Sequence, residues 1–391
     1  MQLIRQKPVS LARVWESVKY PVIMFLLERV ALSLVAAVSI ATLPTLPNAA
    51  GNFVFQPPID QGIGRYLLEP WNRWDTQWYL KIAAQGYAAN DGSLGFYPLY
   101  PLLVRTVGTV LGGQWLLAAL VVSNLAALGC YVMLYRMVDR EFGEVTARDT
   151  LVWLAVFPTG FFLFAGYTES LFLLSVLMAL QSARDGHWAR AGLANGMAML
   201  TRAPGVMLII PLLVEFALRY RRGQVRWSSL IVLGVTSSIG AAFWIYLYAI
   251  FGDANVWARG FSYWRVTGWP GQNMVMAIQM LFSDSVIVVA SNALDLGFTL
   301  LFLVLIGAGV RRVPLAWTIY AIAVAIPSLL AVQVLVPAVP LTSMPRYGLV
   351  AFPVFATLAR TRWRLGAIPI VFSLIAQAIF VMSFARWGWV G

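Results

Sequence analysis

The fold of this chain is decided by residues 189–219, which read ARAGLANGMAMLTRAPGVMLIIPLLVEFALR. The stretch is apolar on both sides of a central interruption, Thr201-Arg202-Ala203-Pro204-Gly205. Proline lacks the N–H that a helix interior needs, and glycine loosens the chain beside it. We therefore predict two short helices that meet at this break. A broken helix at membrane depth is tolerated only where the break lines a cavity or is buried in protein.

The composition of the whole chain places these helices in a membrane. Hydrophobic residues make up 60% of the 391 residues and charged residues only 11%, against roughly 25% in ordinary globular domains. The mean hydropathy is +0.76. So few charges cannot cover a soluble surface of this size, which excludes secreted, nucleic-acid-binding and disordered proteins. The net charge of +12 sits in short clusters between apolar runs, as in cytoplasmic loops, so no nucleic-acid partner is expected.

Apolar runs of about 20 residues recur along the chain, which is the length that a transmembrane helix needs. With the two halves of the broken helix they predict an all-α polytopic membrane protein of about eleven spans, folded as one domain over residues 1–391. The unbroken spans are expected near residues 21–43, 115–136, 149–167, 169–184, 228–251, 285–310, 314–336, 346–360 and 365–385.

The distribution of basic residues predicts the orientation of these spans. A cytoplasmic N-terminus places 18 of the 28 Lys and Arg residues inside and nine outside, with Arg29 within the first span. Such a bias marks the cytoplasmic side. The break in 189–219 is decisive, because a single span there would move the cluster Arg219–Arg226 outside. We expect the N-terminus in the cytoplasm and the C-terminus outside the cell.

Unusual polar and aromatic residues gather on the predicted outer side. The longest loop, residues 44–114, contains the run Trp71–Leu80 and the run Phe96–Pro101. A loop this long and aromatic is typical of function rather than disorder, and we expect it to contain helices at the membrane interface. Charges at membrane depth are costly and default to functional hypotheses. Those on this side are Glu169 after Tyr167-Thr168, Arg202 at the break, Arg265 after Trp264, and Arg346 in Pro345-Arg346-Tyr347.

Four motifs over residues 70–350 resemble PIG-V-type mannosyltransferases. The first is Trp74-Asp75 with Trp78-Tyr79, Gly86-Tyr87 and Phe96-Tyr97-Pro98-Leu99-Tyr100-Pro101. The others are Phe157-Pro158-Thr159-Gly160 with Tyr167-Thr168-Glu169-Ser170, Thr201-Arg202-Ala203-Pro204-Gly205, and Pro345-Arg346-Tyr347. The resemblance implies a membrane glycosyltransferase of the GT-C fold, with a polyprenyl-phosphate mannose donor and an extracytoplasmic active site. It also implies that Asp75 is the catalytic base. We expect a prokaryotic member in the plasma membrane.

The chemistry of such a transfer suggests a role for each candidate residue. The carboxylate of Asp75 would take the proton of an acceptor hydroxyl on a glycolipid or lipid-linked molecule, and a single displacement would invert the anomeric carbon. Arginine forks suit phosphate oxygens, so Arg346, Arg202 and Arg265 are candidates for the leaving phosphate. Glu169 could orient an arginine or hold sugar hydroxyls. The aromatic candidates for stacking on a sugar or on the isoprenoid are Trp74, Trp78 and Tyr97. We expect no cofactor and no obligatory metal.

Two other classes of function stay open from the residues alone. A transporter or flippase of a lipid-linked solute also uses broken helices and buried charges, although no internal repeat is visible in this sequence. A GT-C-like protein without activity could bind lipid only. Each candidate also has a structural interpretation, because Glu169 and Arg202 could pair inside the bundle and Arg346 could reach from a helix end to the interface.

Overall fold

The structure is a computed structural model that describes residues 11–46, 53–341, 343–361 and 366–390. The described chain is mostly helical, which confirms the predicted all-α membrane class. Among the described residues, six helical stretches are long and apolar enough to cross a membrane. They are Val18–Thr42 in α1 (Leu11–Thr42), α5 (Trp115–Phe142), Ala203–Arg221, Ser228–Phe251, α14 (Val286–Gly309) and α18 (Ala367–Ala385).

The remaining helices are shorter than a typical span. The expected number of eleven spans is therefore not confirmed, although a helix begins within or near each predicted run. The shorter helices are α6 (Glu144–Ala155), α7 (Glu169–Arg184), α8 (Trp188–Met199), α12 (Val256–Trp264), α13 (Gln272–Met280), α15 (Leu315–Leu330), α16 (Met344–Leu349) and α17 (Pro353–Ala359).

The interruption in residues 189–219 is confirmed. Helix α8 ends at Met199, a 3-10 turn η5 (Ala203–Leu208) follows, and α9 (Ile209–Arg221) continues the chain. Arg202 itself is extended, with φ −156° and ψ 153°. A Cβ atom at Gly205 would overlap the backbone of Ala198, so the glycine lets the returning chain pack directly against the end of α8.

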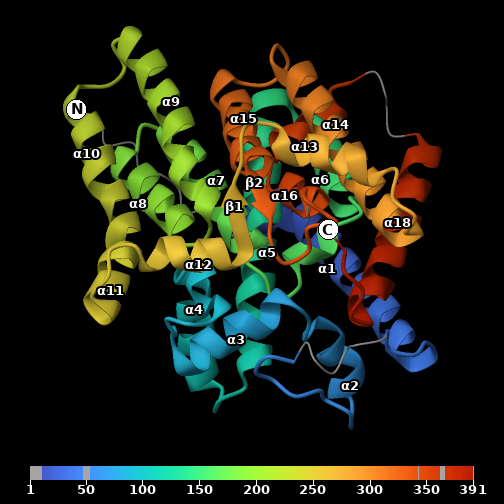
Figure 1. The fold of residues 1–391 in the computed structure, drawn as a ribbon. Helices are drawn as coiled ribbons and strands as arrows, with labels where there is room; N and C mark the ends of the chain where they lie inside the picture. The colour runs from blue at the N-terminus through green and yellow to red at the C-terminus, as the bar shows by residue number, and fades with distance from the viewer. Residues whose placement is uncertain (1–10, 47–52, 342, 362–365, 391) are drawn as a thin grey trace.

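The loop at residues 44–114 contains helices, as predicted. They are α2 (Gly64–Leu67), η2 (Glu69–Trp71), α3 (Asp75–Gln85), η3 (Gly92–Gly95) and α4 (Leu99–Val110). Figure 1 shows α2, α3 and α4 together below the long helices. Helix α10 (Ser228–Ser237) continues through the 3-10 turn η6 (Ser238–Ala241) into α11 (Ala242–Phe251). The segment after α11 packs against the layer of α2, α3 and α4, because the indole of Trp264 donates a hydrogen bond to Gly92 O at 2.8 Å.

The two ends of α7 lie in two separate groups of charges. At its C-terminal end Arg184 pairs with Glu141, and Arg140 pairs with Asp185 at 2.5 Å. Arg219 also donates to the Arg184 carbonyl there. At its other end lies Glu169, and 16 helical residues place the two ends about 24 Å apart. The loops predicted to share the cytoplasmic side therefore do meet at one end of the bundle.

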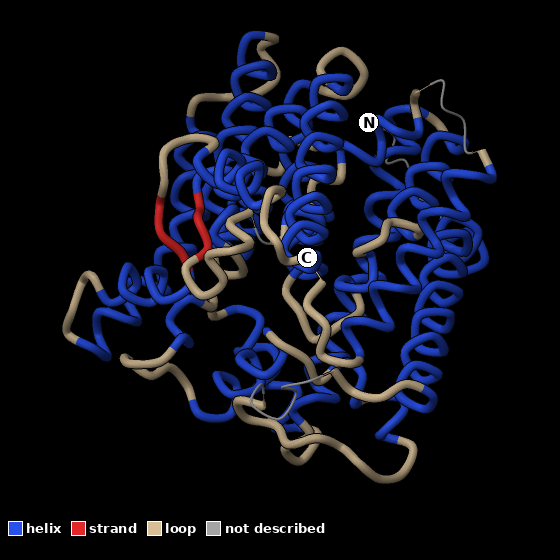
Figure 2. The backbone as a smooth tube through the Cα atoms, turned by 45° about the vertical axis from the view of Figure 1, so that its right-hand side comes forward, coloured by secondary structure: helices blue, strands red, loops and turns tan. Residues whose placement is uncertain are grey.

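Three predicted spans are wrong in their extent. Within 149–167, α6 ends at Ala155 and the chain continues through the turn η4 (Gly160–Leu163), since Pro158 and Gly160 do not favour a helix. Within 314–336, α15 ends at Leu330, and β2 (Ala331–Gln333) pairs antiparallel with β1 (Arg265–Thr267), which Figure 2 shows in red. The span at 346–360 is divided into α16 and α17, with Pro353 beginning the second helix.

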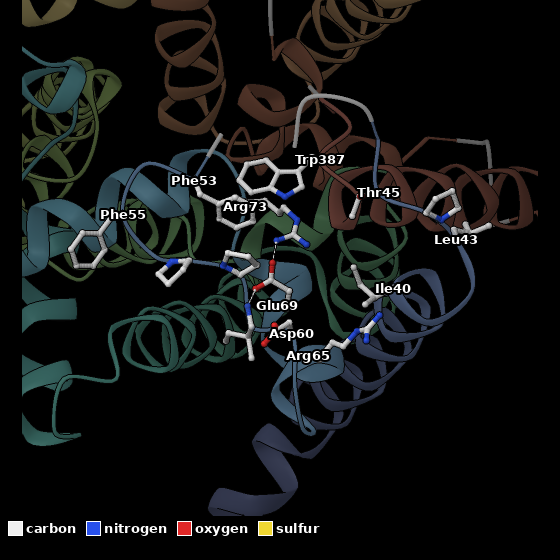
Figure 3. Close-up of a pocket in the computed structure, with 14 residues that line it drawn as sticks. Ile40, Leu43, Thr45, Phe53, Phe55, Asp60, Arg65, Glu69, Arg73 and Trp387 are labelled. Carbon is white, nitrogen blue, oxygen red and sulfur yellow. Dashed lines mark hydrogen bonds and ion pairs between the residues drawn. The ribbon is translucent and has the colours of Figure 1, made fainter. Parts of the chain in front are cut away.

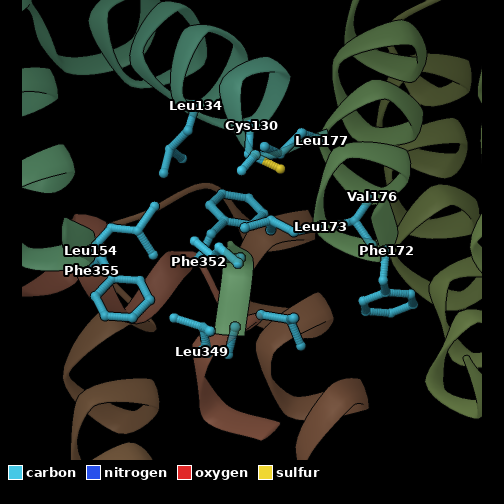
Figure 4. Packing of buried hydrophobic residues seen from close by; sticks show 14 of the residues in the cluster. Cys130, Leu134, Leu154, Phe172, Leu173, Val176, Leu177, Leu349, Phe352 and Phe355 are labelled. Atoms are coloured by element: carbon cyan, nitrogen blue, oxygen red, sulfur yellow. The ribbon is translucent and has the colours of Figure 1, made fainter. Parts of the chain in front are cut away.

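Buried apolar residues pack together the helices that carry the charged residues. Figure 4 shows Leu173 and Leu177 of α7 in one apolar cluster with Leu349 of α16 and Phe352, which precedes α17. Cys130 lies in the same cluster and is fully buried, as a small apolar residue. Because close-packed interiors resist displacement, this contact fixes Glu169 at the start of α7 relative to Arg346 on α16.

Candidate active site

Asp75 begins α3 under an unusual backbone geometry. The preceding residue, Trp74, has φ 50° and ψ −119°, a region that is costly for a bulky side chain, by about 1–3 kcal/mol. The Asp75 N–H donates to the Tyr167 hydroxyl at 3.3 Å. A carboxylate in the first turn of a helix is also favoured by the helix dipole. The local fold thus holds this acid at a defined place.

Four of the predicted site residues form one chain of ion pairs. Arg346 Nη1 lies 2.8 Å from Asp75 Oδ2, and its Nε lies 3.4 Å from Glu169 Oε1. Arg202 Nη1 approaches the same Glu169 oxygen at 2.5 Å and donates to Thr168 Oγ1 at 2.9 Å. The Glu169 side chain is fully buried, while that of Asp75 keeps 20% of its surface exposed. The acid predicted to react is therefore the accessible one.

Two tyrosines complete this charged group. The Arg346 guanidinium lies 5.4 Å from the ring centres of both Tyr167 and Tyr347. Arg265 lies 4.9 Å from the Tyr347 ring and donates a hydrogen bond to its hydroxyl. Arg202 lies 5.5 Å from the same ring. Contacts of this kind stabilise a cation by roughly 0.5–2 kcal/mol, and Tyr347 brings the three arginines together.

The site has spare capacity for an anion and for a hydrogen-bond donor. Ion pairs join Arg202 and Arg346 with two carboxylates, Asp75 and Glu169, while Arg265 donates to the Tyr347 hydroxyl and has the buried Asp295 as an acidic neighbour. Within the described chain, Glu169 Oε2 and Arg346 Nε are buried without a hydrogen-bond partner. Buried polar atoms of this kind are uncommon, because each costs about 1–3 kcal/mol. The arrangement suits a bound group that carries one negative charge and hydroxyls.

The three predicted aromatic residues lie in different surroundings. The Trp74 ring packs edge-on against Trp387 and Trp389, at 5.4 and 5.1 Å between ring centres. Trp78 stacks on Phe96 at 5.8 Å on the other side of the start of α3. Tyr97 is 7% exposed and belongs to a separate apolar cluster with Phe243, so the structure does not bring it to the charged group.

Three residues of this neighbourhood were missed by the sequence prediction. Tyr167 and Tyr347 stand in the quoted motifs beside Glu169 and Arg346, so their positions were a usable signal. Asp295 of α14 gave no signal within its apolar run; it is buried and accepts the Met344 N–H at 3.2 Å, which holds the start of α16.

The described residues also form a cavity of about 800 Å³, which no residue of the charged group lines. Figure 3 shows it between the end of α1, the loop before α2 and the segment after α18. Its walls include Ile40, Phe53, Asp60, Arg65, Arg73 and Trp387. Asp75 does not line this cavity; its neighbour Arg73 does.

The fold and the site together define a helical integral membrane protein with an arginine-rich polar site at one end of its bundle. A family model described as dolichyl-phosphate-mannose-protein mannosyltransferase matches residues 97–248. Glu169 and Arg202 lie within this range, and Asp75 lies before it.

Two curated relatives match a shorter part of the chain. GPI mannosyltransferase 2 of Yarrowia lipolytica is 29% identical over 187 residues, which cover 42% of this chain and 52% of that protein. GPI mannosyltransferase 2 of Drosophila pseudoobscura pseudoobscura is 25% identical over 182 residues, 40% of each chain. The chain thus matches about half or less of each relative. Together with the family model, these similarities confirm the resemblance to PIG-V-type mannosyltransferases that the motifs predicted.

Solved structures give similarities of low sequence identity. ArnT from Cupriavidus metallidurans bound to undecaprenyl phosphate is 17% identical with a TM-score of 0.48, over 90% of this chain and 63% of that one. The apo form of the Archaeoglobus fulgidus oligosaccharyltransferase is 12% identical with a TM-score of 0.42, over 93% and 56%.

Proposed function

We propose that this protein transfers mannose from a polyprenyl-phosphate donor to a hydroxyl of a glycolipid or lipid-linked acceptor, on the extracytoplasmic face of a prokaryotic plasma membrane. The observation that carries the proposal is the meeting of Asp75, Glu169, Arg202 and Arg346, which come from four distant parts of the sequence, in one chain of contacts. The names of the family model and of both relatives favour mannose.

The arginines are suited to the donor phosphate. A lipid phosphate sugar carries one negative charge on a diester, and three guanidiniums, those of Arg202, Arg265 and Arg346, surround Tyr347. Arg346 and Arg202 would bind phosphate oxygens through their forks, with Arg265 as a third positive group. As the donor bond breaks, these cations would stabilise the charge that develops on the leaving phosphate.

Asp75 would act as the general base. The acceptor oxygen attacks the anomeric carbon, its proton passes to the Asp75 carboxylate, and the bond from that carbon to the phosphate oxygen breaks with its electron pair on the phosphate. One such displacement inverts the anomeric centre. Without donor, Arg346 occupies Asp75 Oδ2 at 2.8 Å, so a phosphate that engages Arg346 would release this oxygen for the proton.

Glu169 would hold the mannose rather than react. Its side chain is fully buried, one oxygen is shared by two arginines, and Oε2 has no hydrogen-bond partner among the described residues. A sugar hydroxyl donating to Oε2 would satisfy this atom. Because a buried acceptor left unpaired is costly, the contact would favour a sugar with a hydroxyl at that position.

The depth of the site suits a lipid-linked donor. Helix α7, which begins at Glu169, is about 24 Å long, while the hydrocarbon core of a bilayer is about 30 Å thick. With the Arg184 end at the cytoplasmic boundary, Glu169 would lie several ångströms below the outer boundary. The phosphate of a membrane-held lipid could reach this level without leaving the bilayer. The two-to-one bias of basic residues supports an extracytoplasmic position for this end.

We further propose that the transfer needs no divalent ion and no cofactor. The single phosphate of the donor can be balanced by Arg346 and Arg202, which take the role that a metal ion would have for a diphosphate leaving group.

The proposal is tested by incubating the purified protein with polyprenyl-phosphate mannose and a panel of glycolipid acceptors. Asp75→Asn should lower the transfer rate by about 10²–10⁴-fold, the usual effect of losing a general base. Asp91→Asn is a matched control, since Asp91 is a similarly exposed acid in the same loop, paired with Lys81 at 2.7 Å, and should transfer at the wild-type rate. Equal rates for both variants would remove Asp75 as the base, and no product from the wild type with any acceptor would contradict the proposed function.

A further inference from the structure

The turn between α9 and α10, residues 222–227, gathers three exposed arginines. Arg221 is the last residue of α9, and Arg222 and Arg226 lie in the turn itself. The turn lies at the end of the bundle away from the proposed active site, because Arg219 just before it donates to a carbonyl at the C-terminal end of α7. These arginines therefore form a surface that the proposed transfer does not use.

Acidic side chains do not balance the charge of these three arginines. The acids Glu141 and Asp185 at this end of the bundle pair with Arg184 and Arg140 instead. The nearest acid along the chain, Glu215, lies on α9 before the turn, and within the described chain no ion pair joins it to the three arginines. The turn thus carries a local excess of positive charge that an anion can neutralise.

Hydrogen bonds and packing give the turn a defined shape. Gly223 adopts φ 68°, which suits glycine, and its N–H donates to Tyr220 O at 2.9 Å. The N–H of Gln224 donates to Arg219 O at 3.0 Å. The side chain of Val225 is partly buried against the apolar core. The arginines on both sides of Gly223 are therefore presented by an ordered backbone.

The turn lies at the level of the lipid head groups. It joins the stretches Ala203–Arg221 and Ser228–Phe251, which are both long and apolar enough to cross a membrane, and most residues of each are not buried. On its two sides Tyr220 and Trp227 expose 51% and 60% of their surface, and such aromatic residues are typical of the membrane interface. The arginines beside them therefore meet the phosphates of that leaflet.

An exposed apolar stripe on α10 leads away from the arginines. Trp227 already has helical backbone angles, and Ile231 and Val235 follow at intervals of four residues, so the three lie on one side of the helix. Ile231 exposes 57% and Val235 66% of its surface. Leu233, on the opposite side, is buried towards α8, and Figure 1 shows α10 at the edge of the bundle. An acyl chain can therefore lie along this stripe.

We infer that the α9–α10 turn binds the head group of an anionic phospholipid, with an acyl chain along the exposed stripe of α10. The guanidiniums of Arg222 and Arg226 match the oxygens of the lipid phosphate. A head group with a net negative charge is favoured over a zwitterionic one, because its own cation would be repelled by the unbalanced arginines. The site is independent of the proposed mannose transfer and lies at the other end of the bundle.

Native mass spectrometry of the detergent-purified protein tests the inference with phosphatidylglycerol and phosphatidylcholine as probes. The wild type should bind phosphatidylglycerol more tightly. Replacing both Arg222 and Arg226 by Gln should raise the Kd for phosphatidylglycerol at least about tenfold, because each arginine near an anionic head group contributes about fivefold. The matched control replaces Arg311 and Arg312, an exposed pair after α14, by Gln and should keep the wild-type Kd. Equal Kd values for the two lipids in the wild type, or an equal rise in both variants, would overturn the inference.

Photolabelling in a bilayer tests where the lipid lies. A phosphatidylglycerol with a diazirine in its acyl chain, added to phosphatidylcholine vesicles that contain the protein, should label residues 227–239 in the wild type and in the control variant. The variant without Arg222 and Arg226 should be labelled far less, and so should the wild type with the corresponding phosphatidylcholine probe. Labelling confined to other segments, or equal labelling by the two probes, would overturn the inference. Specific labelling of a protein that transfers no mannose would support the lipid site and contradict the proposed function.

Discussion

Replacement of Glu169 by glutamine should destabilise the protein more than its small change of shape suggests. The glutamine side chain has nearly the size of the original one but carries no charge. Glu169 is fully buried, and its Oε1 lies 2.5 Å from Arg202 Nη1 and 3.4 Å from Arg346 Nε. The substitution leaves these two nearly buried guanidiniums with one carboxylate, Asp75, between them.

The distances set the scale of the effect. With an effective dielectric constant of about 20, the attraction of the Glu169 charge is about 7 kcal/mol for Arg202 and about 5 kcal/mol for Arg346. Most of this gain is offset by the desolvation of three charges, which costs several kcal/mol for each ion. Breaking a buried pair by removing one partner usually costs about 3–5 kcal/mol, because the desolvated partner charge remains. We expect a loss near the lower end of that range, since 12% of the Arg202 side chain is exposed.

Equilibrium unfolding in mixed detergent micelles measures the loss, and a double-mutant cycle assigns it. Glu169→Gln and Arg202→Met should each lower the free energy of unfolding. The double variant should lose less than the sum of the two by about 1–3 kcal/mol, because it no longer contains an unpaired charge at that contact. Additive losses within about 0.5 kcal/mol, or a Glu169→Gln protein as stable as the wild type, would refute the reasoning that these charges are buried and coupled.

Three further predictions concern other parts of the structure. A Cβ at Gly348 would overlap the Phe302 ring, so Gly348→Ala should lower the free energy of unfolding by about 1–3 kcal/mol, whereas Gly297→Ala, where nothing lies within 4 Å, should not. Burial opposes ionisation of Asp91, but hydrogen bonds from Lys81 and Ser93 outweigh it and hold the pKa of Asp91 below its usual value. The stabilisation from ionised Asp91 is therefore complete above the unfolded pKa of about 3.9 and is lost as the pH falls through the lower folded pKa. When the free energy of unfolding is measured at decreasing pH, the wild type should lose more of it than Asp91→Asn. Mannose transfer, once detected, should persist in excess EDTA; its complete loss, with recovery on adding a divalent ion, would contradict the proposed metal-free mechanism.

Local sequence signals were sufficient for the helices and for the break at the end of α8. Proline and glycine act on their immediate neighbours, so Pro204 and Gly205 marked the interruption correctly. Pro158 and Gly160 carry the same local signal, and α6 ends before them at Ala155, so the predicted span 149–167 is too long. Hydropathy over a window of residues averages such local effects away, which is why the extent of a helix is harder to predict than its existence.

Contacts between distant segments could not be obtained in the same way. Arg346 and Asp75 are separated by 271 residues, and nothing in either segment specifies the other. The predicted topology placed both residues on the same side of the membrane. A topology assigns segments to a side, but it does not specify which side chains contact each other. For the same reason the strand pairing of residues 265–267 with 331–333 and the role of Tyr347 between three arginines came only from the structure.

The positive φ of Trp74 is explained by the contacts of the residues on either side of it, Arg73 and Asp75. Arg73 is held on the cavity side by Glu69 and by the Ala385 carbonyl, while Asp75 is held on the other side by Arg346 and Tyr167. Residues two apart in the first turn of a regular helix cannot both meet these demands, so the chain turns sharply between them, and Trp74 adopts φ 50°. The indole contacts with Trp387 and Trp389 and the two sets of hydrogen bonds offset the cost of that conformation. A ten-residue motif can in this way place Arg73 in the wall of the cavity and present the Asp75 carboxylate to the arginines.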